Sequence, residues 1–407
     1  MSGTLPAHKR PFERNRNWPV TQTGVVLGVL ITVMFARVIT AIGVPSIVNF
    51  AHLALAPALA LLLLIGQPSR PAKKTFRGVL ALLAVIVLSA VVNEAGPVNA
   101  VLEFLILGEP FFFFGAIVCR PWNLEDIRRF RVWLFLIALA HMCLSFLQWA
   151  LMGEQGPDLV KGLFLGQNGG HHVGGALALS AAVYFFWDNP LKGLWVRLSI
   201  SLGLAMVAFI SDSKTVVGTF LAAVPILGLF KIKRVTVFVK YVMGSALALL
   251  VFFLLLFFKP LNTGGQLSTL SIRMEHKWSV FDIIRNSHES RINAAIGLGP
   301  GHSASRVATI IPDYYDLLRP FGVTRNATTD RIWAETWAHW TTKTHSSAWA
   351  LTFSWASVWG DLGYLGLLVY LSIWLKLWRI SCTDDHTRII WIAAMMLGGW
   401  FTYLEEP

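Results

Sequence analysis

Long apolar segments, interrupted by one long polar stretch, constrain the fold of this chain most strongly. Segments such as 25–42, 79–92, 132–151 and 235–258 approach or exceed the roughly 20 residues that a helix needs to cross a hydrocarbon core of about 30 Å. Charged residues make up only 14% of the chain, whereas a soluble protein has about 25%. A barrel would show short alternating strands, so we expect an all-helical, polytopic membrane protein.

The pattern predicts one integral domain without a soluble appendage. The expected spans are 19–42, 51–66, 78–93, 99–119, 131–152, 173–188, 195–210, 215–230, 235–258, 346–377 and 389–404. They divide the chain into a basic tail (1–18), nine helices (19–258), a polar loop of about 87 residues (259–345) and C-terminal helices (346–407). The first apolar run is too long for a signal peptide and lacks a cleavage site, so we expect it to be retained.

The distribution of basic residues predicts the orientation. With the N-terminus inside, the inner segments carry 21 Lys and Arg, and the short outer loops carry only Lys161 and Lys214. The positive-inside rule then places the polar loop outside, in the periplasm or its equivalent. Most of the net charge of +12 is therefore explained by basic residues that set the orientation in the membrane, and it does not indicate nucleic-acid binding. Ten cations in the polar loop need a separate explanation, and an anionic head group at one membrane face would provide it.

Within the polar loop, the residues predict a helix over 273–296 and an amphipathic, tryptophan-containing helix over 331–340. Arg273 and Arg291 are eighteen residues apart, five helical turns, so both can face one groove. Arginine binds phosphate through bidentate, charge-assisted hydrogen bonds. An isolated loop arginine is nevertheless more often a solvated surface group.

Two further polar side chains lie where apolar segments meet the outer surface. Lys214 occupies the tight turn 211–215, and a juxtamembrane charge there indicates function, although snorkelling to lipid phosphate also accounts for it. His345 precedes the next apolar run, and a histidine with a pKa near 6.5 can accept a proton from a hydroxyl. A lone histidine is more often only hydrogen-bonded. Other histidines compete for this role: His171, His172, His276, His288, His302 and His339.

The segment Gly297–Gly301 can cradle phosphate with backbone N–H groups, but its spacing matches neither a P-loop nor a dinucleotide fingerprint. Metal-binding motifs such as HExxH are not evident, so we expect no catalytic metal and no cofactor. Metal capture by His171 and His172 stays open as a minor alternative. The three cysteines show no paired spacing, which indicates neither disulfides nor a zinc site.

Taken in order, these motifs resemble the O-antigen ligase and polymerase superfamily of bacterial membrane glycosyltransferases, especially its exopolysaccharide-polymerase-like branch. The similarity covers roughly residues 160–375 and is carried by Asn168 after a glycine-rich break, Ser213-Lys214-Thr215, Arg273 with Trp278, Gly297–Gly301, and His345 followed by Gly360–Leu367. Each motif is loose alone, but their order around one external loop makes the set fairly specific. Ser346 replaces the family's usual Asn, and eleven spans replace about twelve, which a merged helix in 346–378 or an early end would explain.

The resemblance implies an inner-membrane enzyme that transfers an undecaprenyl-pyrophosphate-linked glycan to an acceptor hydroxyl at the periplasmic face. Its partners would be that donor, a glycan or lipid A-core acceptor, and membrane lipids. Arg273 and Lys214, with Arg291 assisting, would bind the pyrophosphate and neutralise charge on the leaving group. His345 would orient or deprotonate the acceptor. The resemblance also implies substrate contacts by Asn168, Trp278, Gly299 and Gly301.

Polymerase is the first interpretation, because Ser213-Lys214-Thr215 resembles that branch, and the ligase stays open as an alternative. A polysaccharide or lipid transporter is a rival from another class. Transporters place ionisable residues near the membrane midplane and show repeated halves. Here Arg37 and, less clearly, Glu103 and Glu109 fall within spans, whereas the cations gather outside, which favours an enzyme. A structural scaffold of a secretion complex is a third possibility, and it would not require Lys214, Arg273 and His345 to converge.

Overall fold

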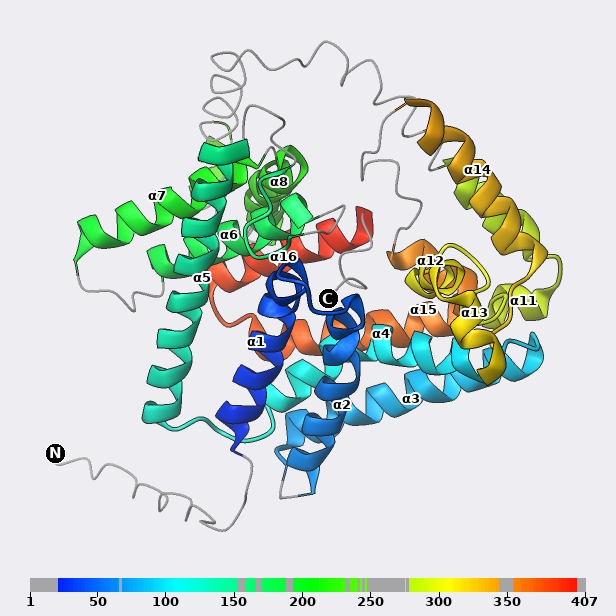
Figure 1. The fold of residues 1–407 in the computed structure, drawn as a ribbon. Coiled ribbons are helices and arrows are strands. Elements are labelled where there is room, and N and C mark those ends of the chain that lie inside the picture. The colour runs from blue at the N-terminus through cyan, green and yellow to red at the C-terminus, as the bar shows by residue number, and fades with distance from the viewer. Residues whose placement is uncertain are drawn as a thin grey trace, which may run out of the picture.

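The computed structural model of the chain describes most of its helical body (Figure 1). The described residues are 21–65, 68–152, 159–165, 170–187, 193–211, 213–230, 278–343 and 354–400, with a few single residues between 235 and 275. Every regular element within these ranges is a helix, and none of their residues is in a strand. The expected all-helical fold is therefore confirmed for the part of the chain that is described.

The helices coincide with the apolar segments over most of their length, although several begin at other residues than expected. They are α1 (Gln22–Ala41), η1 (Ser46–Phe50), α2 (Ala51–Leu64), α3 (Arg70–Val92), α4 (Pro97–Ile117), α5 (Leu124–Met152), α6 (Gly170–Trp187), α7 (Leu194–Ile210), α8 (Lys214–Leu229), α11 (Arg291–Ile296), α12 (Arg306–Asp313), α13 (Tyr315–Leu318), η3 (Arg319–Phe321), α14 (Ala327–Lys343), α15 (Ser354–Ser381) and α16 (Asp385–Trp400). Residues 278–287 are also helical. The expected span 235–258 lies almost entirely outside the described residues.

Several of these helices are long and apolar enough to cross a membrane. Among the described residues there are five: Gln22–Ala41, Arg70–Val92, Pro97–Ile117, Leu124–Leu151 and Trp355–Ser381. Shorter apolar helices cover Val48–Leu64, Leu194–Ile210 and Thr215–Leu229. These features support a multi-pass membrane protein, since a helix of about 20 apolar residues matches the hydrocarbon thickness.

The core of the bundle is formed by α3, α4 and α15. Phe111 of α4 is fully buried, and its ring lies 5.4 Å from that of Tyr370 and 5.2 Å from that of Trp374, both in α15. Close helix approach is helped by Gly78 of α3, where a Cβ atom would lie 2.8 Å from Ile373. Such aromatic and aliphatic packing is a main source of association between membrane helices, because lipid supplies no hydrophobic driving force between them.

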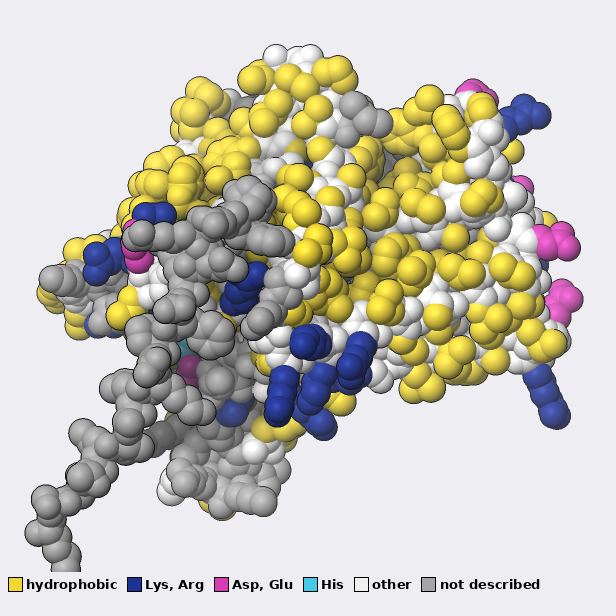
Figure 2. Space-filling model, turned by 90° about the horizontal axis from the view of Figure 1, so that it is seen from below, with side chains coloured by type: hydrophobic (Ala, Val, Ile, Leu, Met, Phe, Trp, Pro, Cys, Tyr) yellow, Lys and Arg dark blue, Asp and Glu magenta, His cyan; other side chains and the backbone are white. Residues whose placement is uncertain are grey.

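The helix ends expected on the inner side meet one another. Gln22, at the start of α1, donates from Nε2 to the carbonyl of Ile117 at 2.8 Å, and the Ser69 N–H donates to the carbonyl of Cys119 at 2.7 Å. The starts of α1 and α3 therefore adjoin the end of α4. Exposed basic residues begin α3: Arg70, Lys73, Lys74 and Arg77. Figure 2 shows Lys and Arg side chains gathered beside a broad hydrophobic surface.

A break inside α15 shows whether residues 346–378 contain two merged membrane helices, as the sequence suggested. Gly363 has φ 64° and ψ −167°, which interrupts the helix after its first nine residues. Nine helical residues measure about 14 Å, too short to cross a hydrocarbon core of about 30 Å. The described part of 346–378 therefore holds a short first segment and one membrane-length helix, and no second span.

The polar loop differs from its expected form. The predicted single helix over 273–296 is wrong over its described part, because a helix over 278–287 is followed by a break and then by α11. Ser290 caps the new helix, its side chain accepting from the Asn293 N–H at 3.0 Å. Arg291 therefore begins a separate helix, and the expected continuous five-turn alignment with Arg273 does not hold. The second expected helix is present and longer, as α14.

Candidate functional site

The polar loop is attached to the membrane helices where its glycine segment meets Asp361 of α15. The carboxyl group of Asp361 is fully buried and accepts from the Gly301 N–H at 2.7 Å and from the Ser303 hydroxyl. Its backbone carbonyl accepts from the Gly299 N–H at 3.1 Å and from Ser89 of α3 at 2.8 Å. One residue therefore joins the loop, α15 and α3, and we call this contact the Asp361 junction.

The glycines at the Asp361 junction are required by close backbone contact. Gly297 has φ 84°, and a Cβ atom there would lie 2.1 Å from the carbonyl oxygen of Asp361. At Gly363 a Cβ atom would lie 2.5 Å from the backbone nitrogen of Gly297. Only glycine combines positive φ with this absence of side-chain volume. The kink in α15 and the glycine segment of the loop therefore fit each other backbone to backbone.

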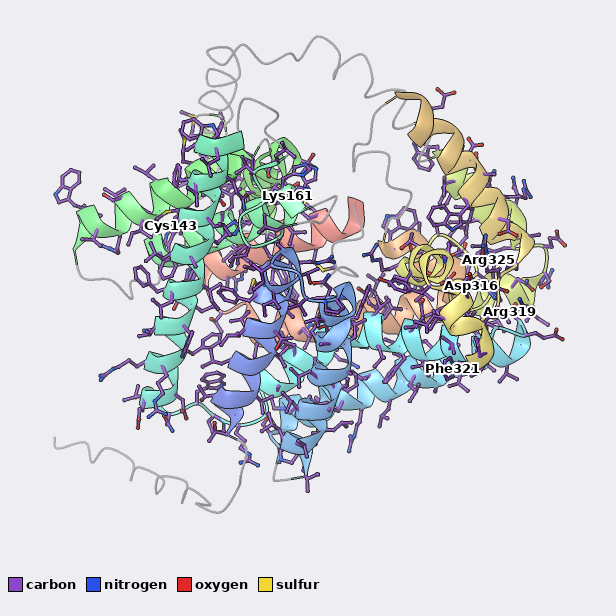
Figure 3. All side chains as sticks on the ribbon, viewed as in Figure 1. Cys143, Lys161, Asp316, Arg319, Phe321 and Arg325 are labelled. Atoms are coloured by element: carbon purple, nitrogen blue, oxygen red, sulfur yellow. The ribbon has the colours of Figure 1, made fainter. Side chains whose placement is uncertain are left out.

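A second set of hydrogen bonds holds the loop to the start of α4. Asn99 is fully buried, and its Nδ2 donates to the carbonyls of Pro300 at 2.9 Å and of Thr324 at 3.0 Å. Its Oδ1 accepts from the Thr324 N–H at 2.9 Å. Both the nitrogen and the oxygen of the Asn99 amide are thus hydrogen-bonded, as a buried polar group requires. Figure 3 shows the segment that carries Thr324 next to α13, with Arg319, Phe321 and Arg325 labelled.

His302 completes this network in its neutral form. Its Nδ1 lies 3.1 Å from the carbonyl of Leu298, and its Nε2 lies 3.0 Å from the hydroxyl of Thr324. Burial lowers the pKa of His302, although the nearby carboxyl of Asp361 acts in the opposite direction. A neutral ring donates from Nδ1 and accepts at Nε2, which matches these partners.

The geometry of the Asp361 junction supports a positioning role, in which it holds the polar loop against the bundle. The N–H groups of Gly299 and Gly301, expected to cradle phosphate, donate instead to Asp361. Backbone donors already used in this way do not offer an anion site, so this geometry does not favour a phosphate cradle. A substrate contact by these two glycines through other atoms stays a prediction. The junction attaches the loop to the bundle at the ends of α3 and α4 that lie opposite their basic ends.

The predicted catalytic residues are only partly described. Arg273, His345 and Asn168 lie outside the described residues, and Lys214 is described as the first residue of α8 without its side chain. Arg291 and Trp278 are both exposed. Figure 1 shows α8 and α11 on different sides of the molecule, so the structure does not bring the start of α8 next to Gly297–Gly301.

Two of the sequence motifs do come together at the start of α6. The Ser213 hydroxyl donates to the carbonyl of His171 at 2.5 Å and lies 2.9 Å from the hydroxyl of Ser211. Gly175 allows this approach, because a Cβ atom there would lie 2.5 Å from Ser213 Oγ. The turn that leads to Lys214 therefore packs against the helix that follows the glycine-rich break. His171 and His172 are adjacent, with ring centroids 3.9 Å apart.

The described residues include no group of three or more His, Cys, Asp or Glu side chains able to hold a metal ion.

Sequence reasoning assigned no role to Asp361, Asn99 and Ser89. The available signal was a carboxyl group inside an apolar segment, which is costly in a membrane and therefore usually paired or functional.

No family model, curated protein or solved structure matches this chain.

Proposed function

We propose that this protein is an inner-membrane glycosyltransferase that polymerises a lipid-linked surface polysaccharide at the periplasmic face. The observation that carries the proposal is the attachment of the polar loop, through Asp361 and Asn99, to helix ends opposite the basic ones. A loop held in this way presents its cations at one membrane face. The positive-inside rule supports the outer face. The order of the sequence motifs supports a glycan on undecaprenyl pyrophosphate as the donor.

In the proposed reaction the acceptor hydroxyl attacks the anomeric carbon of the donor glycan. The new glycosidic C–O bond forms as the bond from that carbon to the pyrophosphate oxygen breaks. The hydroxyl proton passes to His345, and undecaprenyl pyrophosphate leaves with the bonding electron pair. Arg273 and Lys214 stabilise the charge on the leaving group, which is usually the largest catalytic effect in such a transfer. Arg291 begins α11, on a different side of the molecule from α8, so it has no part in this step. No metal or nucleotide takes part.

The in-cell test uses a strain without the chromosomal gene, complemented with Arg273→Ala or His345→Ala at matched membrane expression. Loss of long glycan with accumulation of lipid-linked single repeats is the result expected of a polymerase. Accumulation of lipid-linked long chains would instead identify the alternative, a ligase that transfers glycan to lipid A-core. Normal surface glycan from both variants would contradict the catalytic assignment.

A transporter is supported by one observation, a buried contact between two ionisable side chains within the bundle. His52 Nδ1 of α2 lies 2.5 Å from Glu109 Oε1 of α4, and the His52 side chain is almost completely buried. Ionisable pairs at such positions mark translocation pathways in many membrane proteins. If the protein moves lipid-linked glycan, Glu109→Gln should abolish transfer of donor between leaflets. If it is a polymerase, donor distribution between leaflets should not depend on Glu109.

A further inference from the structure

A contiguous row of aromatic rings lies beside the Asp361 junction. The ring centroids of Trp278 and Phe281 are 5.6 Å apart, those of Phe281 and Trp359 are 5.1 Å apart and stacked, and those of Trp359 and Tyr364 are 6.0 Å apart. Trp355 adds a ring 5.7 Å from Phe281. The row joins the loop helix over 278–287 to the kinked part of α15. We call these five side chains the aromatic row.

The aromatic row is accessible at its edges and closed at its centre. Trp278 is 55% exposed, Tyr364 56% and Trp355 38%, whereas Trp359 is only 6% exposed. Trp359 rests on a small buried cluster that includes Val280, Ile284 and Ile332. The exposed rings are thus held by a packed base, which lowers the conformational entropy lost when a ligand binds.

Two adjoining rings at the centre of the row each carry a polar nitrogen without a partner. Trp359 Nε1 and His288 Nδ1 are both buried, and neither has a hydrogen-bond partner among the described residues. The two rings are 4.6 Å apart. His288 Nε2 lies 3.4 Å from the carbonyl of Gly360, so it carries the proton and leaves Nδ1 as an acceptor. Burial lowers the pKa of His288, which keeps the ring neutral near pH 7.

We propose that the aromatic row is a glycan subsite, which binds a pyranose ring through its C–H face and one hydroxyl through Trp359 and His288. Aromatic rings carry a negative face that attracts positively polarised C–H groups, and Tyr and Trp add polar edges. A hydroxyl both donates and accepts, so it matches a donor and an acceptor on two adjoining rings. Small-molecule sites combine aromatic walls with a few convergent polar groups in the same way.

This inference rests on the proposed function and assigns a binding site to the sugar of its substrate. In sequence, Trp278 follows Arg273 by five residues, and the first segment of α15 begins nine residues after His345. The row is therefore close in sequence to both residues in which the chemistry is proposed to reside. The competing explanation is that the rings anchor the protein at the lipid interface, where Trp and Tyr are common. That explanation does not account for a buried donor and a buried acceptor on two adjoining rings.

The test measures glycan binding without catalysis. The full chain is placed in nanodiscs of phosphatidylethanolamine and phosphatidylglycerol, free of glycolipid. The probe is the set of oligosaccharides released by mild acid from the surface polysaccharide of the source cell. Saturation-transfer difference NMR reports contact between sugar C–H groups and protein. We expect Trp355→Ala and Tyr364→Ala to weaken binding at least about tenfold. Trp359→Phe keeps the ring but removes the N–H, and should weaken binding about three- to tenfold.

Trp187→Ala is the matched control, because Trp187 is 56% exposed and lies at the end of α6, outside the row. It should bind like the unaltered protein. Equal saturation transfer in all variants, or none in the unaltered protein, would overturn the subsite. Reduced nanodisc insertion of the row variants with unchanged glycan binding would identify an interfacial anchor instead. Intact binding with normal glycan from His345→Ala cells would overturn the transferase and leave the subsite standing.

Discussion

Asp361 is the residue on which attachment of the polar loop depends. Its carboxyl group is fully buried, and its partners are the Gly301 N–H and the Ser303 hydroxyl. Removing the acceptor leaves buried donors without partners, and each such donor costs about 1–3 kcal/mol. The buried carboxyl is therefore more important for holding the loop than any exposed charge in it.

We expect Asp361→Ala to lower the free energy of unfolding by about 2–4 kcal/mol, and Asp361→Asn by less, because its amide oxygen still accepts one bond. Thermal unfolding in detergent and limited proteolysis of the loop provide the measurement. Asp316→Asn, an exposed carboxyl in the same loop, is the control. If Asp361→Ala unfolds and is cleaved like Asp316→Asn, the Asp361 junction does not hold the loop.

His302 makes the stability of the loop depend on pH. Burial lowers its pKa in the folded protein, so the unfolded chain binds a proton more readily. Stability is therefore full above the unfolded pKa of about 6.5 and falls as the pH drops below that value. We expect the unfolding midpoint to decrease between pH 7.5 and 5.5, and His302→Gln to show a smaller decrease. An identical pH dependence in the two proteins would show that His302 does not contribute.

At the scale of elements, the backbone contact between Gly297 and Gly363 requires the absence of side chains. A Cβ atom at either position would meet backbone atoms at 2.5 Å or less, and backbone cannot move aside as a side chain can. Gly297→Ala and Gly363→Ala should each lower stability by about 1–3 kcal/mol. Thermal unfolding measures this change. Gly28→Ala in α1, where no atom lies within 4 Å, should be neutral or slightly stabilising.

The sequence predicted which segments form helices, but it predicted less well the residues at which those helices begin and end. The apolar run predicted a start at residue 78 for the third span, whereas α3 begins at Arg70. Ser69 caps it and Pro71 follows, a combination that marks a helix start even where the first turns are basic. For α11, Ser290 gave the capping part of this signal, without a proline, within an expected continuous helix. Polar helical turns escape a search for apolar runs.

At the scale of the whole molecule, the order of the helices along the chain follows from the order of the apolar segments. Contacts between distant segments do not. Ser89 and Asp361 are 272 residues apart and hydrogen-bonded, and no local pattern pairs them. Asn99 and Pro300 are a second such pair. Periodicity and capping describe neighbours in sequence, so the candidate catalytic residues could be named from the sequence while the Asp361 junction could not.

The proposed function requires that the whole chain forms glycosidic bonds by itself. The most direct measurement uses the purified protein in proteoliposomes with its undecaprenyl-pyrophosphate-linked oligosaccharide repeat, in the presence of EDTA and without nucleotide. The expected product is a ladder of longer lipid-linked chains, formed by the unaltered protein and by Trp187→Ala and lost in His345→Ala. Recovery of the donor at its original length would contradict the proposed polymerase, whether the donor stays in its leaflet or appears in the opposite one.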